Sequence, residues 1–463
     1  MVDQRPAAEI AGRPGRETGW WPLAAIVAAV FMLMLDATVV TVAVPGMRRD
    51  LHAGLGDLQW VMNAYTMAMA ASQLTAGAFA DRWGRRRSFL AGVALFALAS
   101  LACGLAPTAA ALIAARAVQG LAGALMFATT LALIAQCYTG QARGVAFGVR
   151  GTAAGLAVVL GPVIGGALVS ALGWRWVFLV NVPVAAVTLA MGVRSLPREE
   201  PASEPRRIDL AGPCLLAVSL SLLVFGLLRA EDHGWGSTGS LLVFGASAVS
   251  FVVFLVAESR LRDPMLDLPL FRGRAFSGTQ IGSFTVQASV FALLIYVSLW
   301  FQDQLGFSAL KTGLCFLPLV VPILVAGPVA GAVMDRLPKG PLVAGSLALL
   351  AVAILLMTGL DAGSSWTHLA PGMALAGLAC GIALPTLGSL AVDVADQSRL
   401  GMASGVNNTV MQVGSAVGIA VYGAVLSRHR VFADGLDALF TTASAVALCG
   451  AVLTAVLLAR KWP

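Results

Sequence analysis

Long runs of apolar residues recur along nearly the whole chain, and this recurrence constrains the fold more than any other feature. A run of about 20 apolar residues is long enough to cross the ~30 Å hydrocarbon core of a bilayer as a helix. Charged residues make up only 11% of the 463 residues, whereas an ordinary soluble domain carries about 25%. A chain with this few charges cannot cover several soluble cores with polar surface. We therefore expect most of it to lie in lipid.

Fourteen such runs predict fourteen membrane-spanning helices and therefore an all-α polytopic membrane protein. The runs are continuous, which excludes a strand barrel, whose spans of about 10 residues alternate in polarity. We place the spans at residues 20–45, 58–80, 87–106, 109–135, 144–171, 175–193, 208–229, 239–257, 276–301, 312–334, 341–360, 368–391, 402–426 and 438–459.

Two long charged loops group these spans as six, two and six. The pair between the loops contains no intramembrane charge and few polar groups, so it is predicted to be an insertion between two six-helix bundles. The predicted segments are an N-terminal tail (1–19), a first bundle (20–193), cytoplasmic linkers with the inserted pair (194–275, holding helices 208–229 and 239–257), a second bundle (276–459) and a C-terminal tail (460–463).

The net charge of +7 does not indicate a nucleic-acid partner, because the basic residues lie in short loops between apolar runs. Most of the 30 lysines and arginines fall on the side of the two termini, which places both termini in the cytoplasm, at the inner (plasma) membrane. The six cysteines form no CxxC and the four histidines no HExxH, so no disulfide framework, metal site or cofactor is predicted.

An internal repeat supports duplicated halves. GAFADRWGRR (Gly77 to Arg86) ends the second predicted helix, and GAVMDRLPKG (Gly331 to Gly340) ends the tenth, at the same point of each half. Duplicated halves with a cavity between them are a transporter architecture. The candidate gating residues are Gly77, Asp81, Arg82, Arg85, Asp335 and Arg336. The alternative is that the arginines only determine topology; Asp335 is expected to matter less than Asp81, because Pro338 breaks the pattern.

Two opposite charges lie deep within predicted spans. Asp36 is nine residues before Pro45, about 13 Å below the outer end of its helix, and Arg116 is seven residues after Ala109, about 10 Å below. Charges within the membrane are costly and usually mark ion or substrate pathways. We therefore expect Asp36 and Arg116 to face one cavity and to compete for a proton, the alternative being an ion pair that only fixes helix packing.

Five motifs in order carry a family resemblance: LDATVVTVAVP (Leu35 to Pro45), GAFADRWGRRR (Gly77 to Arg87), LIAARAVQGLAGA (Leu112 to Ala124), GLAVVLGPVIGGAL (Gly155 to Leu168) and GWRWVFLVNVP (Gly173 to Pro183). The chain resembles the major facilitator superfamily, and specifically its fourteen-helix drug:proton antiporter family. It departs from the family's first motif at Thr41, where Asn is usual, and at Val44, where Leu is usual. The second half matches through helix pattern, the repeated loop and ASGVNNTVMQVGSAVG (Ala403 to Gly418).

The resemblance implies proton coupling at Asp36 and Arg116, an inner-gate latch at Asp81, and an antiporter motif in the fifth helix that restricts leak. That motif comprises Gly155, Gly161, Pro162, Gly165 and Gly166. We expect its glycines to line one side of the helix and let it pack tightly or bend, since small residues permit close helix approach. The alternative is that they are packing residues only.

Polar and aromatic residues inside apolar spans are the candidates for substrate contact. They are Asn63, Tyr65, Gln119, Gln280, Gln287, Tyr296, Trp300, Asn407, Asn408 and Gln412. For each of them the alternative is a hydrogen bond between helices.

These features predict a proton-coupled secondary transporter, functional as a monomer, that exports lipophilic drugs, with a mild preference for cations, or a secondary metabolite. The absence of a G-x4-G-K-[ST] loop excludes an ATP-driven pump. The sequence contains no nucleophile–base arrangement, so we do not expect an enzyme. The alternative function is a uniporter or importer of a small organic solute without proton exchange. The expected partners are membrane lipids and the lipophilic substrate, with protons as the coupling ion.

Overall fold

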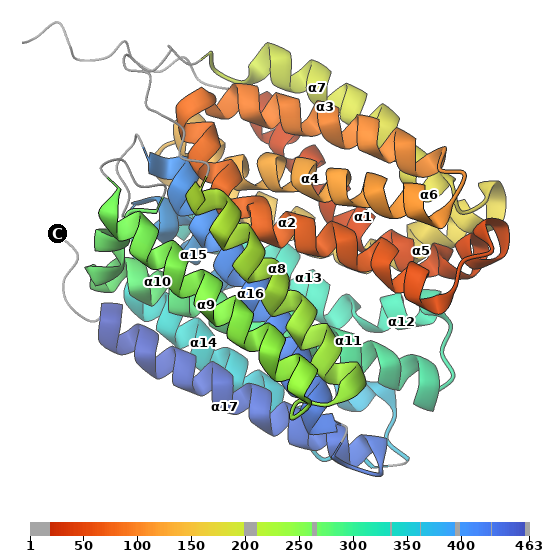
Figure 1. The fold of residues 1–463 in the computed structure, drawn as a ribbon. Helices are drawn as coiled ribbons and strands as arrows, with labels where there is room; N and C mark the ends of the chain where they lie inside the picture. The colour runs from red at the N-terminus through yellow and green to blue at the C-terminus, as the bar shows by residue number, and fades with distance from the viewer. Residues whose placement is uncertain are drawn as a thin grey trace, which may run out of the picture.

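The computed structural model describes residues 19–198, 211–261, 266–333, 336–361, 363–393, 399–426 and 428–458. All regular secondary structure in these residues is helical, as predicted (Figure 1). The predicted tails 1–19 and 460–463 lie outside the described residues except for Gly19, and so does Asp335.

Helices coincide with all fourteen apolar runs. In the first half they are α1 (Trp21–Leu51), α2 (Leu55–Trp83), α3 (Arg85–Gly104), α4 (Ala109–Cys137), α5 (Gly140–Leu172), α6 (Trp176–Leu179) and α7 (Asn181–Ser195). The helices at the predicted insertion are α8 (Ala211–His233) and α9 (Thr238–Arg260). The second half contains η2 (Leu268–Arg272), α10 (Arg274–Val286), η3 (Gln287–Phe291), α11 (Ala292–Leu299), η4 (Trp300–Gln304), α12 (Ala309–Cys315), α13 (Leu317–Val333), α14 (Lys339–Leu355), η5 (Trp366–His368), α15 (Ala370–Asp393), α16 (Leu400–Leu426) and α17 (Phe432–Leu458).

Several predicted spans are interrupted rather than straight. Two π-helical segments, η3 and η4, flank α11 in the ninth run, and the tenth run is divided between α12 and α13. In the part of the chain that the structure describes, nine helices are long and apolar enough to cross a bilayer, and a tenth if the bent α5 counts as one span. The remaining apolar runs form shorter or more polar helices.

The helices form two groups with separate cores. One core packs residues of α1, α2, α3 and α4, among them Leu33 and Phe89, and the other packs residues of α11, α13, α14, α15 and α17, among them Leu350 and Phe440. Figure 1 shows the first group in red to yellow and the second in green to blue. The pair α8 and α9 lies outside both cores: α8 packs on α2 and α16, while α9 exposes Leu242 and Val249.

The two groups meet closely at one end of the molecule, the end where α1 begins and α17 ends, here called the terminal end. There α5 packs along α13, and α2 packs along α16. Residues 400–409 of α16 are all buried, whereas most residues from 410 to 419 are partly exposed. The groups therefore touch at the terminal end and diverge along α16 toward the other end, whereas α5 continues to contact α12 of the second half.

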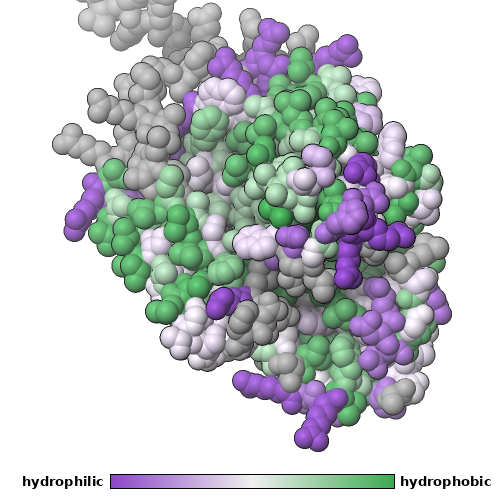
Figure 2. Space-filling view, turned by 45° about the vertical axis from the view of Figure 1, so that its right-hand side comes forward, coloured by the Kyte–Doolittle hydropathy of each residue, from purple (hydrophilic) through white to green (hydrophobic). Residues whose placement is uncertain are grey.

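The outer surface is apolar along the helices. Leu98, Leu242, Val325 and Val456 are each at least 64% exposed although they are large hydrophobic side chains. Figure 2 shows hydrophobic side chains over broad parts of the visible face, with hydrophilic ones gathered in separate patches. Contiguous exposed apolar surface of this kind fits contact with lipid rather than water.

Candidate functional site

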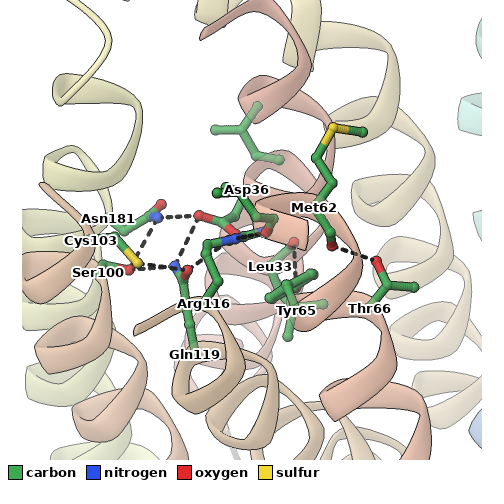
Figure 3. Close-up of polar contacts among 12 residues, drawn as sticks. Leu33, Asp36, Met62, Tyr65, Thr66, Ser100, Cys103, Arg116, Gln119 and Asn181 are labelled. Atoms are coloured by element: carbon green, nitrogen blue, oxygen red, sulfur yellow. Dashed lines mark hydrogen bonds and ion pairs between the residues drawn. The ribbon is translucent and has the colours of Figure 1, made fainter. Parts of the chain in front are cut away.

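Asp36 and Arg116, which the sequence places at similar depth, form a buried ion pair, the arrangement that was the alternative to a shared cavity. Arg116 Nη1 lies 2.6 Å from Asp36 Oδ2, and both side chains are no more than 2% exposed. The second carboxylate oxygen, Oδ1, accepts hydrogen bonds from Gln119 Nε2 at 3.0 Å and from Asn181 Nδ2 at 2.8 Å. Both oxygens of the carboxylate therefore accept hydrogen bonds from side chains of α4 and α7 (Figure 3).

Arg116 joins three helices. Besides Asp36 of α1, it donates from Nη1 to Gln119 Oε1 of its own helix at 2.7 Å and from Nε to the Val61 carbonyl of α2 at 3.2 Å. Its guanidinium lies 4.1 Å from the ring centroid of Tyr65 and 5.6 Å from that of Phe178. A change in the charge of Asp36 would therefore act directly on the contact between α1, α4 and α2.

The network contains residues that the sequence analysis missed. Gln119 Nε2 also donates to Ser100 Oγ at 2.7 Å, Asn181 Nδ2 lies 3.3 Å from the same hydroxyl, and Cys103 Sγ lies 3.6 Å from Gln119 Oε1. Asn181 stands within the fifth motif, which was the one signal that could have identified it. The predicted shared cavity is wrong for this conformation, because these groups seal Asp36 inside the first half at 0% exposure.

Asp81 links the two halves at the terminal end. Its carboxylate accepts hydrogen bonds from the backbone N–H groups of Gly401 at 2.8 Å and Met402 at 2.7 Å, and it forms an ion pair with Arg85 at 2.9 Å. Gly401 and Met402 are in the first turn of α16, where unpaired N–H groups and the helix dipole favour an anion. The predicted gating residue thus caps a helix of the opposite half.

Glycines make two matching helix crossings beside this cap. A Cβ on Gly77 would lie 2.2 Å from the carbonyl oxygen of Gly401, and a Cβ on Gly331 would lie 2.1 Å from that of Gly144. The repeated G-x3-D-R therefore places its glycine at α2–α16 in one half and at α13–α5 in the other. Arg82 is half-buried at the end of α2, and Arg336 is exposed.

A further ion-pair cluster joins the halves at the terminal end. Asp393, the last residue of α15, pairs with Arg143 of α5 at 2.5 Å and with Lys339 of α14 at 2.6 Å. Ser389 also donates to Asp393 at 3.1 Å. The cluster adds a second polar contact between the halves, which the sequence analysis did not predict.

The glycines of the antiporter motif do not all lie on one side of α5, contrary to expectation. A Cβ on Gly161 would lie 1.9 Å from Thr38 Oγ1, and one on Gly165 would lie 2.7 Å from a methyl carbon of Val39. Gly155 is nearest to Ile323 of α13, at 4.0 Å, and Gly166 has nothing within 4 Å. The reason is that positions spaced by six and one residues cannot share one face of a 3.6-residue helix.

The expected bend is present. The two parts of α5, Gly140–Val158 and Val163–Leu172, meet at 50°, so Gly161 and Pro162 lie within the break. Proline removes a hydrogen bond from the helix interior and glycine weakens it, which accounts for a bend here. Gly161 and Gly165 thus allow α5 to pack closely on α1 at Thr38 and Val39, which follow Asp36 by two and three residues.

This packing gives a test within one motif. We expect Gly161→Ala to lower the apparent Tm of the purified protein by several degrees, because overpacking a tight contact costs about 1–3 kcal/mol. Gly166→Ala is the matched control, since a Cβ there meets no atom within 4 Å. Differential scanning fluorimetry measures both, and equal Tm values for the two variants would contradict the assigned contact.

The predicted substrate residues separate into distinct environments. Tyr65 and Gln119 belong to the Asp36 network, Tyr296 donates to the Ile419 carbonyl at 2.5 Å, and Trp300 lies in the core of the second half. In this conformation these side chains make contacts between helices, which was the alternative to substrate contact. Asn63 and Gln412 are half-buried.

The other candidates include unpaired polar atoms. Asn407 accepts a hydrogen bond from Ser283 at 2.7 Å, and Asn408 donates to the Phe127 carbonyl of the opposite half at 3.3 Å. Gln287 begins the π-helical segment η3 and has an unpaired Oε1. Both amide atoms of Gln280 are unpaired; this residue lines an apolar groove of about 760 Å³ between α10 and α17.

Two groups of helices that diverge toward one end, with a sealed ion pair in one group, define a membrane transporter built from duplicated halves. The family model of the Major Facilitator Superfamily matches residues 26–419 and 279–462. The chain belongs to this superfamily, and the resemblance predicted from its motifs is confirmed.

Relatives refine this placement. The chain is 36% identical over 431 residues to the "Tetracenomycin C resistance and export protein" of Streptomyces glaucescens, covering 93% of this chain and 79% of that protein. It is 35% identical over 456 residues to the "Puromycin resistance protein pur8" of Streptomyces alboniger, covering 95% and 90% respectively. The crystal structure of the human organic anion transporter MFSD10 (TETRAN) shares the fold, with a TM-score of 0.68 at 19% identity over 96% of this chain and all of that one.

Proposed function

We propose that the protein exports a lipophilic drug or secondary metabolite in exchange for protons. The observation that carries this proposal is the buried Asp36–Arg116 pair, because an ionisable pair inside the membrane usually marks an ion pathway. The printed names of the relatives, which describe resistance to tetracenomycin C and puromycin, support export of such compounds.

We further propose that all fourteen apolar runs span the membrane in a six, two and six arrangement. Both termini lie in the cytoplasm, because the basic residues gather at the terminal end. The protein works as a monomer in the plasma membrane. In this topology the terminal end is the cytoplasmic end, and the conformation described above is closed to the cytoplasm.

The coupling step that we propose begins at Asp36. A proton that binds its carboxylate neutralises the charge that pairs with Arg116. The Arg116 side chain can then shift, which alters its hydrogen bond to the Val61 carbonyl of α2. The other end of α2 carries Asp81, which caps α16 of the opposite half. Because α2 joins the two sites as one helix, protonation at one can bias the gate at the other.

The test of this function is transport in proteoliposomes with an imposed pH gradient. Tetracenomycin C is the probe, added outside vesicles with an acidic lumen, and protein-free vesicles are the control. Concentrative uptake that collapses with nigericin is the expected result. Equilibration at the same rate with and without the gradient would instead indicate a uniporter and overturn the proposal.

The inserted pair α8–α9 is proposed to be peripheral to transport. Single cysteines at the exposed positions Val218 and Val252 should react with a membrane-permeant maleimide at the same rate with and without the transported probe. A cysteine at the half-buried Gln412 is the comparison, and its reaction should slow with the probe present. Strong protection at several α8 or α9 positions would refute the peripheral role.

A further inference from the structure

A second arginine lies deep in the first half, outside the Asp36 network. Arg150 is six residues after the start of the predicted span 144–171, so it lies about 9 Å into the membrane from the terminal end. This is about a third of the ~30 Å hydrocarbon thickness. Neither the proposed coupling step nor the gate uses this residue.

The guanidinium of Arg150 is held but not neutralised. Its Nε donates to Thr130 Oγ1 at 2.9 Å, and its central carbon lies 4.7 Å from the ring centroid of Phe127. Among the described residues, no group accepts a hydrogen bond from either terminal nitrogen, and no carboxylate lies within ion-pair distance. Nη2 is fully buried without a partner.

An unpaired cation inside the membrane is costly, and such residues normally pair with an opposite charge. Asp36 is an acidic residue within a predicted span of the same half, but its two oxygens are occupied by Arg116, Gln119 and Asn181. The described residues therefore supply no counter-charge for Arg150. A ligand that brings a negative charge would supply it.

Arg150 lies next to a contact between the two halves. The carbonyl of Phe127, the residue on which Arg150 stacks, accepts a hydrogen bond from Asn408 of α16. Asn408 Oδ1 is itself buried and unpaired, and α16 becomes partly exposed from Val410 onward. Arg150 is therefore close to the point along α16 where burial between the halves ends.

We propose that Arg150 binds the acidic group of the transported compound, so that the substrates are lipophilic organic anions. This rests on the proposed export function and replaces the mild preference for cations expected from the sequence. The planar guanidinium can bind a carboxylate through two parallel hydrogen bonds, and Thr130 and Phe127 fix its orientation. The bound pair is neutral, which removes the cost of the isolated charge.

The test is binding of matched pyrene probes to the full-length protein in nanodiscs, with empty nanodiscs subtracted. Pyrene-1-carboxylate and pyrene-1-carboxamide have the same rings and differ in charge. Wild type should bind the carboxylate about tenfold or more tightly than the amide, measured by fluorescence anisotropy. Arg150→Gln and Arg150→Met should remove this preference, whereas Arg150→Lys should retain part of it.

Arg175→Gln is the matched control, because it removes one positive charge from a half-exposed pair with Asp50. Its preference should equal that of wild type. Equal affinity of wild type for the two probes, or an unchanged preference in whichever of Arg150→Gln and Arg150→Met folds, would overturn the proposal. The assay contains no pH gradient, so its outcome is independent of whether export is coupled to protons.

Discussion

Asp36→Asn is expected to reduce proton-driven export to the level of protein-free liposomes. The amide keeps the shape of the side chain and one acceptor oxygen, whereas its NH2 group cannot accept the hydrogen bonds that the other carboxylate oxygen accepts. It can neither bind nor release a proton. Substrate–substrate exchange without a pH gradient should persist if the variant folds, because that exchange requires no proton. Paired transport assays in proteoliposomes, with and without the gradient, separate these two activities.

Folding needs a control, since the substitution leaves Arg116 as a buried charge without its carboxylate. Breaking a buried ion pair from one side costs about 3–5 kcal/mol. The double variant Asp36→Asn/Arg116→Gln removes both charges, so it should recover stability yet remain uncoupled. Asp57→Asn, which replaces a carboxylate that accepts a hydrogen bond from Gly54 at the start of its own helix, should behave as wild type. Undiminished gradient-driven export in Asp36→Asn would refute the coupling role.

The second large effect is expected at the gate. Asp81→Asn should shift the population toward the conformation open at the terminal end by about ten- to a hundredfold. The carboxylate accepts two backbone hydrogen bonds from α16 and pairs with Arg85, and such contacts to a charged group are worth about 1.5–3 kcal/mol. The two hydrogen bonds to α16 exist only while the halves touch, whereas the pair with Arg85 lies within the first half. Loss of the two bonds to α16 therefore destabilises this conformation selectively.

Distances between spin labels measure this shift. Labels at the exposed positions Gln141 and Leu337 report on the terminal end, and labels at Leu105 and Val431 report on the opposite end. In Asp81→Asn the first distance distribution should lengthen and the second shorten. Asp57→Asn, the same substitution within a local cap, should leave both unchanged. Identical distributions in wild type and Asp81→Asn would exclude the latch.

The positions of the helices could be predicted from the hydropathy of the sequence. Every apolar run is helical in the structure, although some runs are divided between successive helices. A backbone in lipid must satisfy its hydrogen bonds internally, and a helix does so locally. The similar depth of Asp36 and Arg116 also followed from sequence, since a fixed rise of 1.5 Å per residue gives depth, but whether they pair or face a cavity was left open. The repeated G-x3-D-R likewise located both glycine crossings.

What the sequence could not determine is how each helix is rotated about its axis. Ser100 and Asn181 are ordinary polar residues in apolar helices, and only the packing of α3 and α7 turns them toward Asp36. The rotation of α5 about its axis directs Gly161 to α1 but Gly155 to α13. It also places Arg150 beside Thr130, where no described carboxylate lies within ion-pair distance. Depth is a local property of the chain, whereas neighbours across helices depend on tertiary packing, so spans and charges were predictable and the contacts of neutral polar groups were not.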